Sequence, residues 1–336
     1  MDTQRNPKRP RVDEENSSRD PAFYFDDGNI VLSAKDADEC IVYFRVHRSI
    51  LTKHSPVFKD MFTMPLPQDE DQYDGAPLVE MAGDSADALR SLVALLYDPE
   101  CIPEILKSAD FAARMYNPVV LAKKYQIDWI PKMAATQLRE LWPQSLTGWD
   151  RIADMERYDA FTFAYCPETW DGDENCIRQL GEPVTAIRLA RECNALGILP
   201  VAFLHLLRLP YKDSDDGDDA RVTWVAPERK LLSTEDLVRL ALARERMGKW
   251  FSSSSRRDPP WDSSRCKSQN PTECHLTIVR AWLEIAADFA RDGNLLAAPR
   301  RIPGNDICFT CSSILKQEMQ DQRQKFFDEL PTFFQL

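Results

Sequence analysis

Between residues 30 and 62 the hydrophobic pattern changes from the period of strands to that of helices, and this order of elements constrains the fold most. After the turn Asp27-Gly28-Asn29, the run Ile30-Val31-Leu32 predicts a short strand. Over residues 40–46 both alternating sets of positions are largely apolar, which predicts a strand covered on both faces. His47 then opens a helical segment. Ser55-Pro56 predicts the start of another, with a serine cap before a proline at the first helical position.

The next segments continue this mixture of strands and helices. Residues 64–77 are rich in proline and acidic residues and predict an exposed loop, followed by a third short strand over Leu78–Met81. Asp84 is expected to cap a helix whose apolar stripe repeats at helical spacing. Two more helical stretches follow, at residues 111–124 with an interruption at Pro118 and at residues 131–142.

The C-terminal half has only helical patterns. Thr185–Leu209 predicts two helices that meet at Gly197 and Pro200, and Ser233 with Asp236 predicts a capped helix start. Residues 251–272 are rich in Ser, Pro and charge and predict a flexible insertion, after which helical periodicity resumes at residues 276–289.

These patterns predict an α+β chain: a small β-sheet with a helical cluster, followed by a mostly α-helical domain. We expect a disordered, mixed-charge tail over residues 1–20, a first domain over 21–142 and a helical C-terminal domain over 143–336.

Composition and motifs argue against several classes of function. The chain has only 11 glycines, and the glycine-rich phosphate-binding motifs are absent, as are the H-E-x-x-H and G-x-S-x-G signatures of common hydrolases. The formal net charge of −12 argues against direct nucleic-acid binding, which needs clustered Lys and Arg. We therefore predict a protein that is not an enzyme.

The N-terminal segment lacks the apolar region of a secretory signal, and the apolar stretch at residues 196–209 is too short and too interrupted to span a bilayer. An intracellular protein is expected, with no membrane contact and its nine cysteines as thiols or metal ligands. Lys8, Arg9 and Arg11 form a basic cluster in the tail that has two interpretations, a nuclear localisation signal or a solvated charge run. The protein is accordingly expected to be nuclear or, otherwise, cytoplasmic.

One cysteine constellation in the C-terminal half has the ligand types of a metal site. It comprises Cys266, Cys274, the neighbouring His275, and the C-x-x-C motif Cys308-Phe309-Thr310-Cys311. The C-x-x-C motif fits half of a tetrahedral zinc site, and Cys266 and Cys274 would supply the other half at a wider spacing than a usual zinc knuckle. Three interpretations remain open: structural zinc, unrelated buried thiols, and a redox pair, which the absence of a βαβ pattern disfavours.

Taken together, the motifs of the first half resemble a BTB/POZ domain. The resemblance rests on Asp27 to Leu32, on Phe44 to Leu51 and on Ser55 to Phe62, with Leu89 to Tyr97 similar to the helix after the third strand of that family. The helical C-terminal half and its end, Leu330 to Leu336, resemble the BTB proteins that are common in mushroom-forming (basidiomycete) fungi.

The resemblance implies a protein-interaction module, often a homodimer, without catalysis. The residues it places at the partner or dimer surface are Asp27, Asn29, His47, Arg48, Met64, Leu66 and Gln68. Two departures matter. Asn29 stands where many dimeric members have an aspartate, and Gln68 stands where cullin-binding members have a glutamate. Both changes remove the charge that a charge-assisted bond requires.

The predicted function is that of an adaptor or scaffold that binds proteins through its BTB domain. The two alternatives are a substrate adaptor of a cullin ubiquitin ligase and a nuclear transcriptional co-regulator. No cofactor is expected other than structural zinc at Cys266, Cys274, Cys308 and Cys311.

Overall fold

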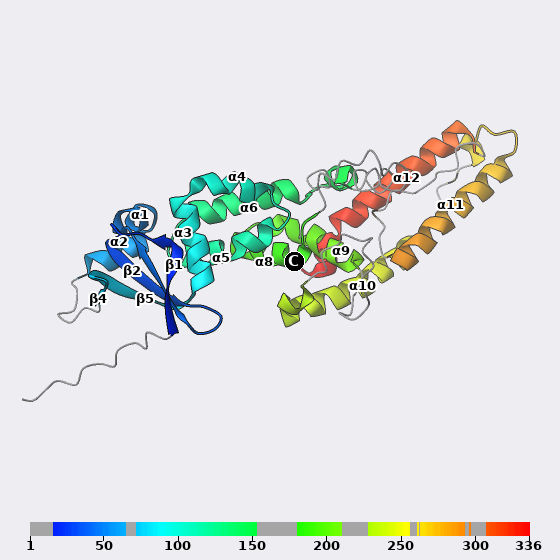
Figure 1. Cartoon of the computed structure of the whole chain (residues 1–336). Coiled ribbons are helices and arrows are strands. Elements are labelled where there is room, and N and C mark those ends of the chain that lie inside the picture. Colours follow the sequence, from blue (N-terminus) through cyan, green and yellow to red (C-terminus); the bar gives the residue numbers. More distant parts are fainter. Residues whose placement is uncertain are drawn as a thin grey trace, which may run out of the picture. The chain divides into compact units, whose positions relative to one another are not determined.

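The computed structural model describes residues 16–64, 72–152, 180–209, 228–255, 261, 263–292, 296 and 307–336. It contains two compact units, residues 1–134 and 135–336 (Figure 1). The division falls within helix α6 (Trp129–Leu141), ahead of the boundary expected at residue 142. A sheet with helices forms the first unit, and the described part of the second is mostly helical, so the predicted α+β class is confirmed.

The sheet of the first unit has five strands in the order β1-β3-β2-β5-β4. Strands β2 (Ile30–Lys35) and β3 (Ile41–Val46) are antiparallel, and both were predicted. Phe44 from one face of β3 and Tyr43 from the other are both buried, as the double apolar pattern of this strand predicts. Tyr43 packs in a small cluster with Val31 and Ala76, and its ring stacks on Tyr73.

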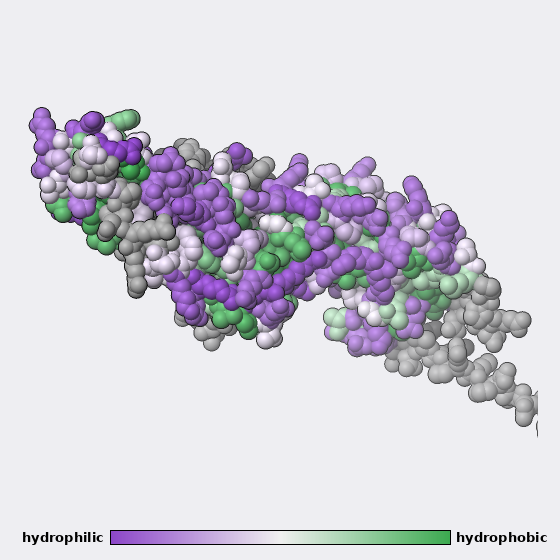
Figure 2. Space-filling view, turned by 180° about the vertical axis from the view of Figure 1, so that it is seen from behind, coloured by the Kyte–Doolittle hydropathy of each residue, from purple (hydrophilic) through white to green (hydrophobic). Residues whose placement is uncertain are grey.

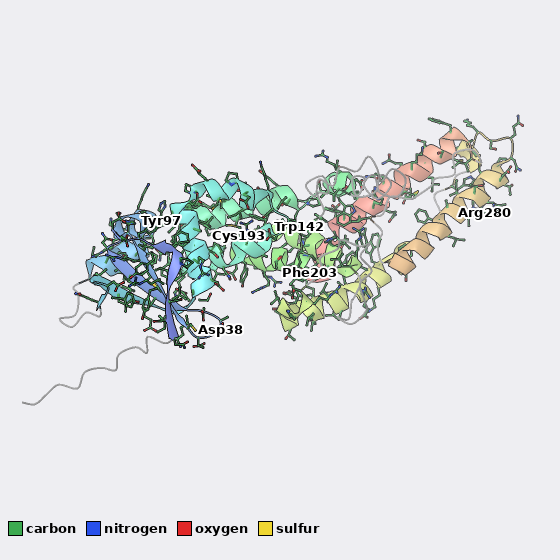
Figure 3. The ribbon with its side chains drawn as sticks, in the orientation of Figure 1. Asp38, Tyr97, Trp142, Cys193, Phe203 and Arg280 are labelled. Carbon is green, nitrogen blue, oxygen red and sulfur yellow. The ribbon has the colours of Figure 1, made fainter. Side chains whose placement is uncertain are left out.

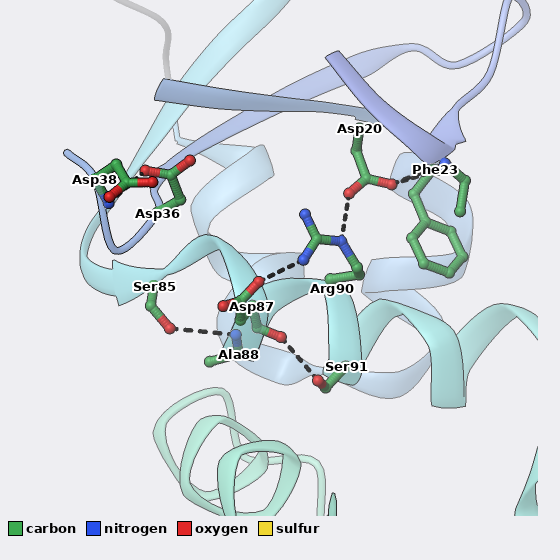
Figure 4. A network of polar contacts seen from close by, with 10 residues as sticks. Asp20, Phe23, Asp36, Asp38, Ser85, Asp87, Ala88, Arg90 and Ser91 are labelled. Carbon is green, nitrogen blue, oxygen red and sulfur yellow. Dashed lines mark hydrogen bonds and ion pairs between the residues drawn. The ribbon is translucent and has the colours of Figure 1, made fainter. Parts of the chain in front are cut away.

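Strand β1 (Ser17–Tyr24) begins inside the tail that was expected to be disordered, and it pairs in parallel with β3. Its anchor is Asp20, whose buried carboxylate accepts hydrogen bonds from the backbone N–H groups of Ala22 and Phe23 and from Nε of Arg90, at 3.0, 2.9 and 2.7 Å (Figure 4). A polar anchor of this kind gives no hydrophobic periodicity, so the pattern carried no strand signal. Residues 1–15 lie outside the described residues.

Part of the expected loop at residues 64–77 is a hairpin. Strand β4 (Gln72–Tyr73) pairs antiparallel with the start of β5 (Ala76–Ser85), which also extends further than the predicted strand at 78–81. The two turn residues, Asp74 and Gly75, have φ values of 50° and 75°. Asp-Gly with two positive φ values is typical of a tight hairpin turn whose twist matches the strands.

Five α-helices and the short helix η2 (Pro99–Cys101) complete the described part of the first unit that precedes α6: the α-helices are α1 (Arg48–His54), α2 (Pro56–Thr63), α3 (Ala86–Tyr97), α4 (Ile102–Lys107) and α5 (Phe111–Lys124). The predicted cap at Ser55 is confirmed. Its buried hydroxyl oxygen accepts a hydrogen bond from the Phe58 N–H at 3.0 Å and donates one to the Tyr125 carbonyl at 2.6 Å. One serine therefore fixes the start of α2 and ties it to the end of α5.

Two details of the helix prediction are wrong. The cap of α3 is Ser85, whose hydroxyl accepts a hydrogen bond from the Ala88 N–H at 3.2 Å. Asp84 instead forms an ion pair with Lys124 at 2.7 Å and accepts a hydrogen bond from the Tyr125 hydroxyl. Helix α5 also continues through Pro118, because six buried side chains on its inner face outweigh the hydrogen bond that proline removes.

The helices of the second unit enclose a core that contains Trp142 and Phe203 (Figure 3). After the end of α6 they include α8 (Pro183–Glu192), α9 (Leu199–Arg208), α10 (Thr234–Ser255), α11 (Pro271–Asp292), α12 (Phe309–Asp328) and α13 (Leu330–Phe334), with the short helices η4 (Leu196–Ile198) and η5 (Arg229–Leu231). Helices α8 and α9 are the pair predicted between residues 185 and 209. The insertion expected at 251–272 begins inside α10 and ends inside α11, and it includes the short helix η6 (Ser263–Arg265).

Ser233 caps α10 as predicted, because its hydroxyl accepts a hydrogen bond from the Asp236 N–H at 3.1 Å. The Asp236 carboxylate does not complete a capping box. It forms a two-fold ion pair with Arg191 of α8 and a further contact with Arg239 at 3.2 Å. Its side chain is only 2% exposed, so these arginines neutralise a carboxylate that is nearly out of water.

The face shown in Figure 2 is mainly hydrophilic, with apolar side chains in separate patches. Large exposed apolar residues include Leu237 and Val238 of α10 and Leu283 of α11. Among the described helices, none is both long and apolar enough to cross a bilayer.

Candidate functional site

The second unit brings four cysteines of the sequence constellation together. The sulfur atoms of Cys266, Cys274, Cys308 and Cys311 all lie within 4.8 Å of one another. Cys266 follows the short helix η6, Cys274 lies in the first turns of α11, Cys308 is the N-cap residue of α12, and Cys311 lies in the first turn of that helix. Three separate segments therefore meet at one point.

The arrangement of α11 and α12 explains this convergence. Figure 1 shows the two helices side by side, with their N-terminal ends at the same end of the unit. Their contact is a small apolar core that continues away from the cysteines and consists of Ile278, Ala281, Ile307, Leu315 and Met319, together with Cys274 and Cys311. The two helices run in the same direction, so a cysteine at the start of one meets a C-x-x-C motif at the start of the other.

Backbone N–H groups point at the sulfurs. The Lys267 N–H donates to Sγ of Cys308 at 3.4 Å, and the Cys308 N–H donates to Sγ of Cys274 at 3.3 Å. Hydrogen bonds from the backbone of Cys311 and Lys267 favour the thiolate of Cys308 and lower its pKa to about 6. Burial has the opposite effect on Cys311 and raises the pKa of that thiol.

Two aromatic rings lie near the cluster, those of Trp261 and His275. Trp261 packs against the apolar core beside the cysteines, and its ring stacks on His275 with the centroids 4.4 Å apart. His275 belongs to the constellation in the sequence, but the four potential ligand atoms that lie within 4.8 Å of one another are all sulfurs. Trp261 had no signal in the sequence, because it lies in the segment that was expected to be a flexible insertion.

Four thiols at this spacing can bind a metal ion. Soft thiolate ligands in a set of four suit zinc or an iron–sulfur centre. The interpretation as unrelated buried thiols requires independent positions, whereas here four of the chain's nine cysteines share one site.

In the first unit, His47 lies at the junction of β3 and α1 and is held by three neighbours. Its Nδ1 is 3.0 Å from the Tyr97 hydroxyl, which also accepts a hydrogen bond from the His47 backbone N–H at 2.7 Å. Its Nε2 is 3.3 Å from Asp27, and the ring of Phe25 packs 5.5 Å away. Burial raises the pKa of Tyr97. Tyr97 was not predicted as a partner, because fifty residues separate it from His47.

Asn29 and Arg48 also have partners within the unit. The Asn29 side-chain oxygen accepts a hydrogen bond from the Arg48 N–H at 2.8 Å and so caps α1 from the preceding loop. The Arg48 guanidinium donates to the Phe62 carbonyl at 2.6 Å and lies over the Phe62 ring. Met64, by contrast, is 64% exposed at the end of α2.

The remaining candidate residues lie outside the described residues. These are Leu66 and Gln68 of the loop after α2, and Lys8, Arg9 and Arg11 of the basic cluster. The partner surface expected from the resemblance therefore remains a prediction.

Comparison with protein families identifies a BTB/POZ domain at residues 28–140. The match covers β2 to β5 and α1 to α5 and continues into α6. Searches of curated proteins and of solved structures found no match to the chain.

Proposed function

Because residues 28–140 form a BTB/POZ domain, which is a protein-interaction module, we propose that this chain acts as an adaptor or scaffold without catalysis of its own. The domain match is the observation that supports this proposal. The BTB/POZ domain would bind or assemble partners, and the helical unit that follows would carry a second binding surface or support the first.

The test is purification of the tagged full chain from cells that express it, after chemical cross-linking, with mass spectrometry of the bound proteins. We expect reproducible partners cross-linked to residues within 28–140. If the cross-linked partners are no more abundant than in a tag-only control, or if every cross-link lies outside the domain, the proposal fails.

A cullin-ligase adaptor is the first specific form of this function. The exposed Met64, at the end of α2, supports it as an accessible apolar contact next to the loop with Leu66 and Gln68. Met64→Glu should abolish cullin recovery, whereas Leu283→Glu changes an equally exposed residue of the other unit, 61% against 64%, and should not. If no cullin is recovered from the unmodified chain, this form is excluded.

The second form is a nuclear co-regulator, supported by Lys8, Arg9 and Arg11 in the sequence. Replacement of these three residues by alanine should abolish nuclear enrichment of a fluorescent fusion. An unchanged distribution would contradict the signal.

Origin in a basidiomycete fungus and a homodimer through Asp27, Asn29, His47 and Arg48 stay predictions. Light scattering of the purified chain would test the dimer.

The proposal includes one cofactor. A zinc ion at Cys266, Cys274, Cys308 and Cys311 would be structural, since four thiolates leave no open position for a substrate.

A further inference from the structure

We infer that the four cysteines form a closed, all-thiolate Zn²⁺ site that fastens the starts of α11 and α12 to the segment carrying Cys266, and that the parallel packing of these two helices depends on the ion. This inference rests on the zinc of the proposed function and adds what the ion does for the fold.

The distances fit a single ion. A zinc ion with bonds of about 2.3 Å to four sulfurs at tetrahedral angles requires sulfurs about 3.8 Å apart. Sγ of Cys266 and Sγ of Cys308 are 3.9 Å apart, and every pair lies within 4.8 Å. Small side-chain rotations therefore complete the tetrahedron. An iron–sulfur cluster would need more widely separated sulfurs, since sulfide and several irons lie between them.

The surroundings fit the charge of such a site. Four thiolates and one Zn²⁺ carry a net charge of −2, which needs compensation in a partly buried position. The N–H groups of Lys267 and Cys308 already donate to two of the sulfurs. Helices α11 and α12, which are 22 and 20 residues long, both direct their N-terminal ends, where the macrodipole is positive, toward the cluster.

The arrangement of the helices around the site indicates that the ion holds α11 and α12 together. Antiparallel helices can be joined by a short turn, whereas α11 and α12 run in the same direction and their starts are 38 residues apart in sequence (271 and 309). Within the described residues, the apolar core that joins them contains seven buried residues, two of which are the cysteines Cys274 and Cys311. Because these two cysteines belong both to the metal site and to the core between the helices, the free energy of metal binding adds directly to the free energy that holds the helices together.

The test uses the full chain, purified under reducing conditions without chelators. Elemental analysis should find one zinc ion per chain, and replacement by Co²⁺ should give the intense near-ultraviolet band of sulfur-to-cobalt charge transfer. After removal of zinc by a strong chelator, hydrogen exchange should accelerate at least tenfold in α11 and α12, while exchange in β2 and β3 of the first unit stays the same.

The matched variants are Cys308→Ser with Cys311→Ser, which should abolish zinc binding, and Cys40→Ser with Cys101→Ser, two cysteines outside the cluster, which should retain it. Protein with far less than one zinc ion per chain that also fails to take up added Zn²⁺ or Co²⁺ would overturn the inference. So would zinc loss without faster exchange in α11 and α12. These readings do not involve partner binding, so failure here is distinguishable from failure of the adaptor function.

Discussion

His205 of α9 should make the stability of the second unit fall as the pH drops below neutrality. Its side chain is buried, with 4% of the residue exposed, and its Nδ1 atom has no hydrogen-bond partner among the described residues. The ring of Trp142 contacts it edge-on, with the centroids 5.9 Å apart. Burial, with a smaller contribution from Arg208, lowers the pKa of His205 from 6.5 to about 3.

The sign follows from which state binds the proton. Between pH 6.5 and pH 3 the unfolded chain protonates this imidazole and the folded chain does not, so stability is lost as the pH falls through this range. Linkage with these two pKa values gives a loss of about 2 kcal/mol between pH 7 and pH 5, which corresponds to about a 30-fold change in the unfolding equilibrium.

The comparison is between the full chain and a His205→Leu variant, which has a side chain of similar volume that cannot titrate. Hydrogen exchange of the α9 amides, corrected for the pH dependence of intrinsic exchange, measures the opening free energy of this unit. From pH 7 to pH 5 the unmodified chain should lose about 30-fold more protection than the variant. His54→Leu, in the first unit, is the control and should behave like the unmodified chain in α9. Equal losses of protection in the unmodified chain and in His205→Leu would refute the reasoning.

Two further predictions concern single polar contacts. Ser55→Ala should destabilise the first unit by about 2–3 kcal/mol in urea unfolding, because it removes a helix cap and leaves a buried carbonyl unpaired. Ser49→Ala, on an exposed face of α1, should change stability by less than about 0.5 kcal/mol, and similar effects of the two changes would contradict the role of the cap. Arg191→Met should lower the free energy of unfolding of the second unit by about 2 kcal/mol. The substitution removes the two-fold ion pair that neutralises the buried Asp236 carboxylate, which then keeps only its contact with Arg239. Adding Asp236→Leu to this variant should restore part of the lost stability, as measured by thermal unfolding. If the losses of stability caused by the two single substitutions simply add up in the double variant, the ion pair does not contribute as described.

Local sequence patterns predicted β2, β3 and the start of α2, because each depends on neighbours within a few residues. The alternation over residues 40–46 and the Ser55-Pro56 cap needed no distant contact to be recognised. The Asp74-Gly75 turn is also a local sequence pattern for a hairpin. It was not predicted, because the surrounding proline and acidic residues favoured an exposed loop.

Other elements depended on contacts that are distant in sequence. Strand β1 is held in place by the hydrogen bond from Arg90 to the Asp20 carboxylate. Asp84 does not cap α3, because its carboxylate binds the side chains of Lys124 and Tyr125 instead. In both cases a long-range charged hydrogen bond decided between local alternatives, and hydrophobic periodicity contains no information about such bonds.

The sequence by itself determined the fold class of this protein and indicated its candidate metal ligands. The change from strand to helix periodicity predicted a small sheet with helices, and the C-x-x-C motif at residues 308–311 predicted half of a candidate thiolate site. Only the tertiary structure shows that the sulfurs of Cys266 and Cys274 lie within 4.8 Å of the two sulfurs of this motif. The reason is physical: the starts of two helices 38 residues apart in sequence come together only when the helices pack in parallel, and the residues in contact there come from segments that no local pattern relates to one another.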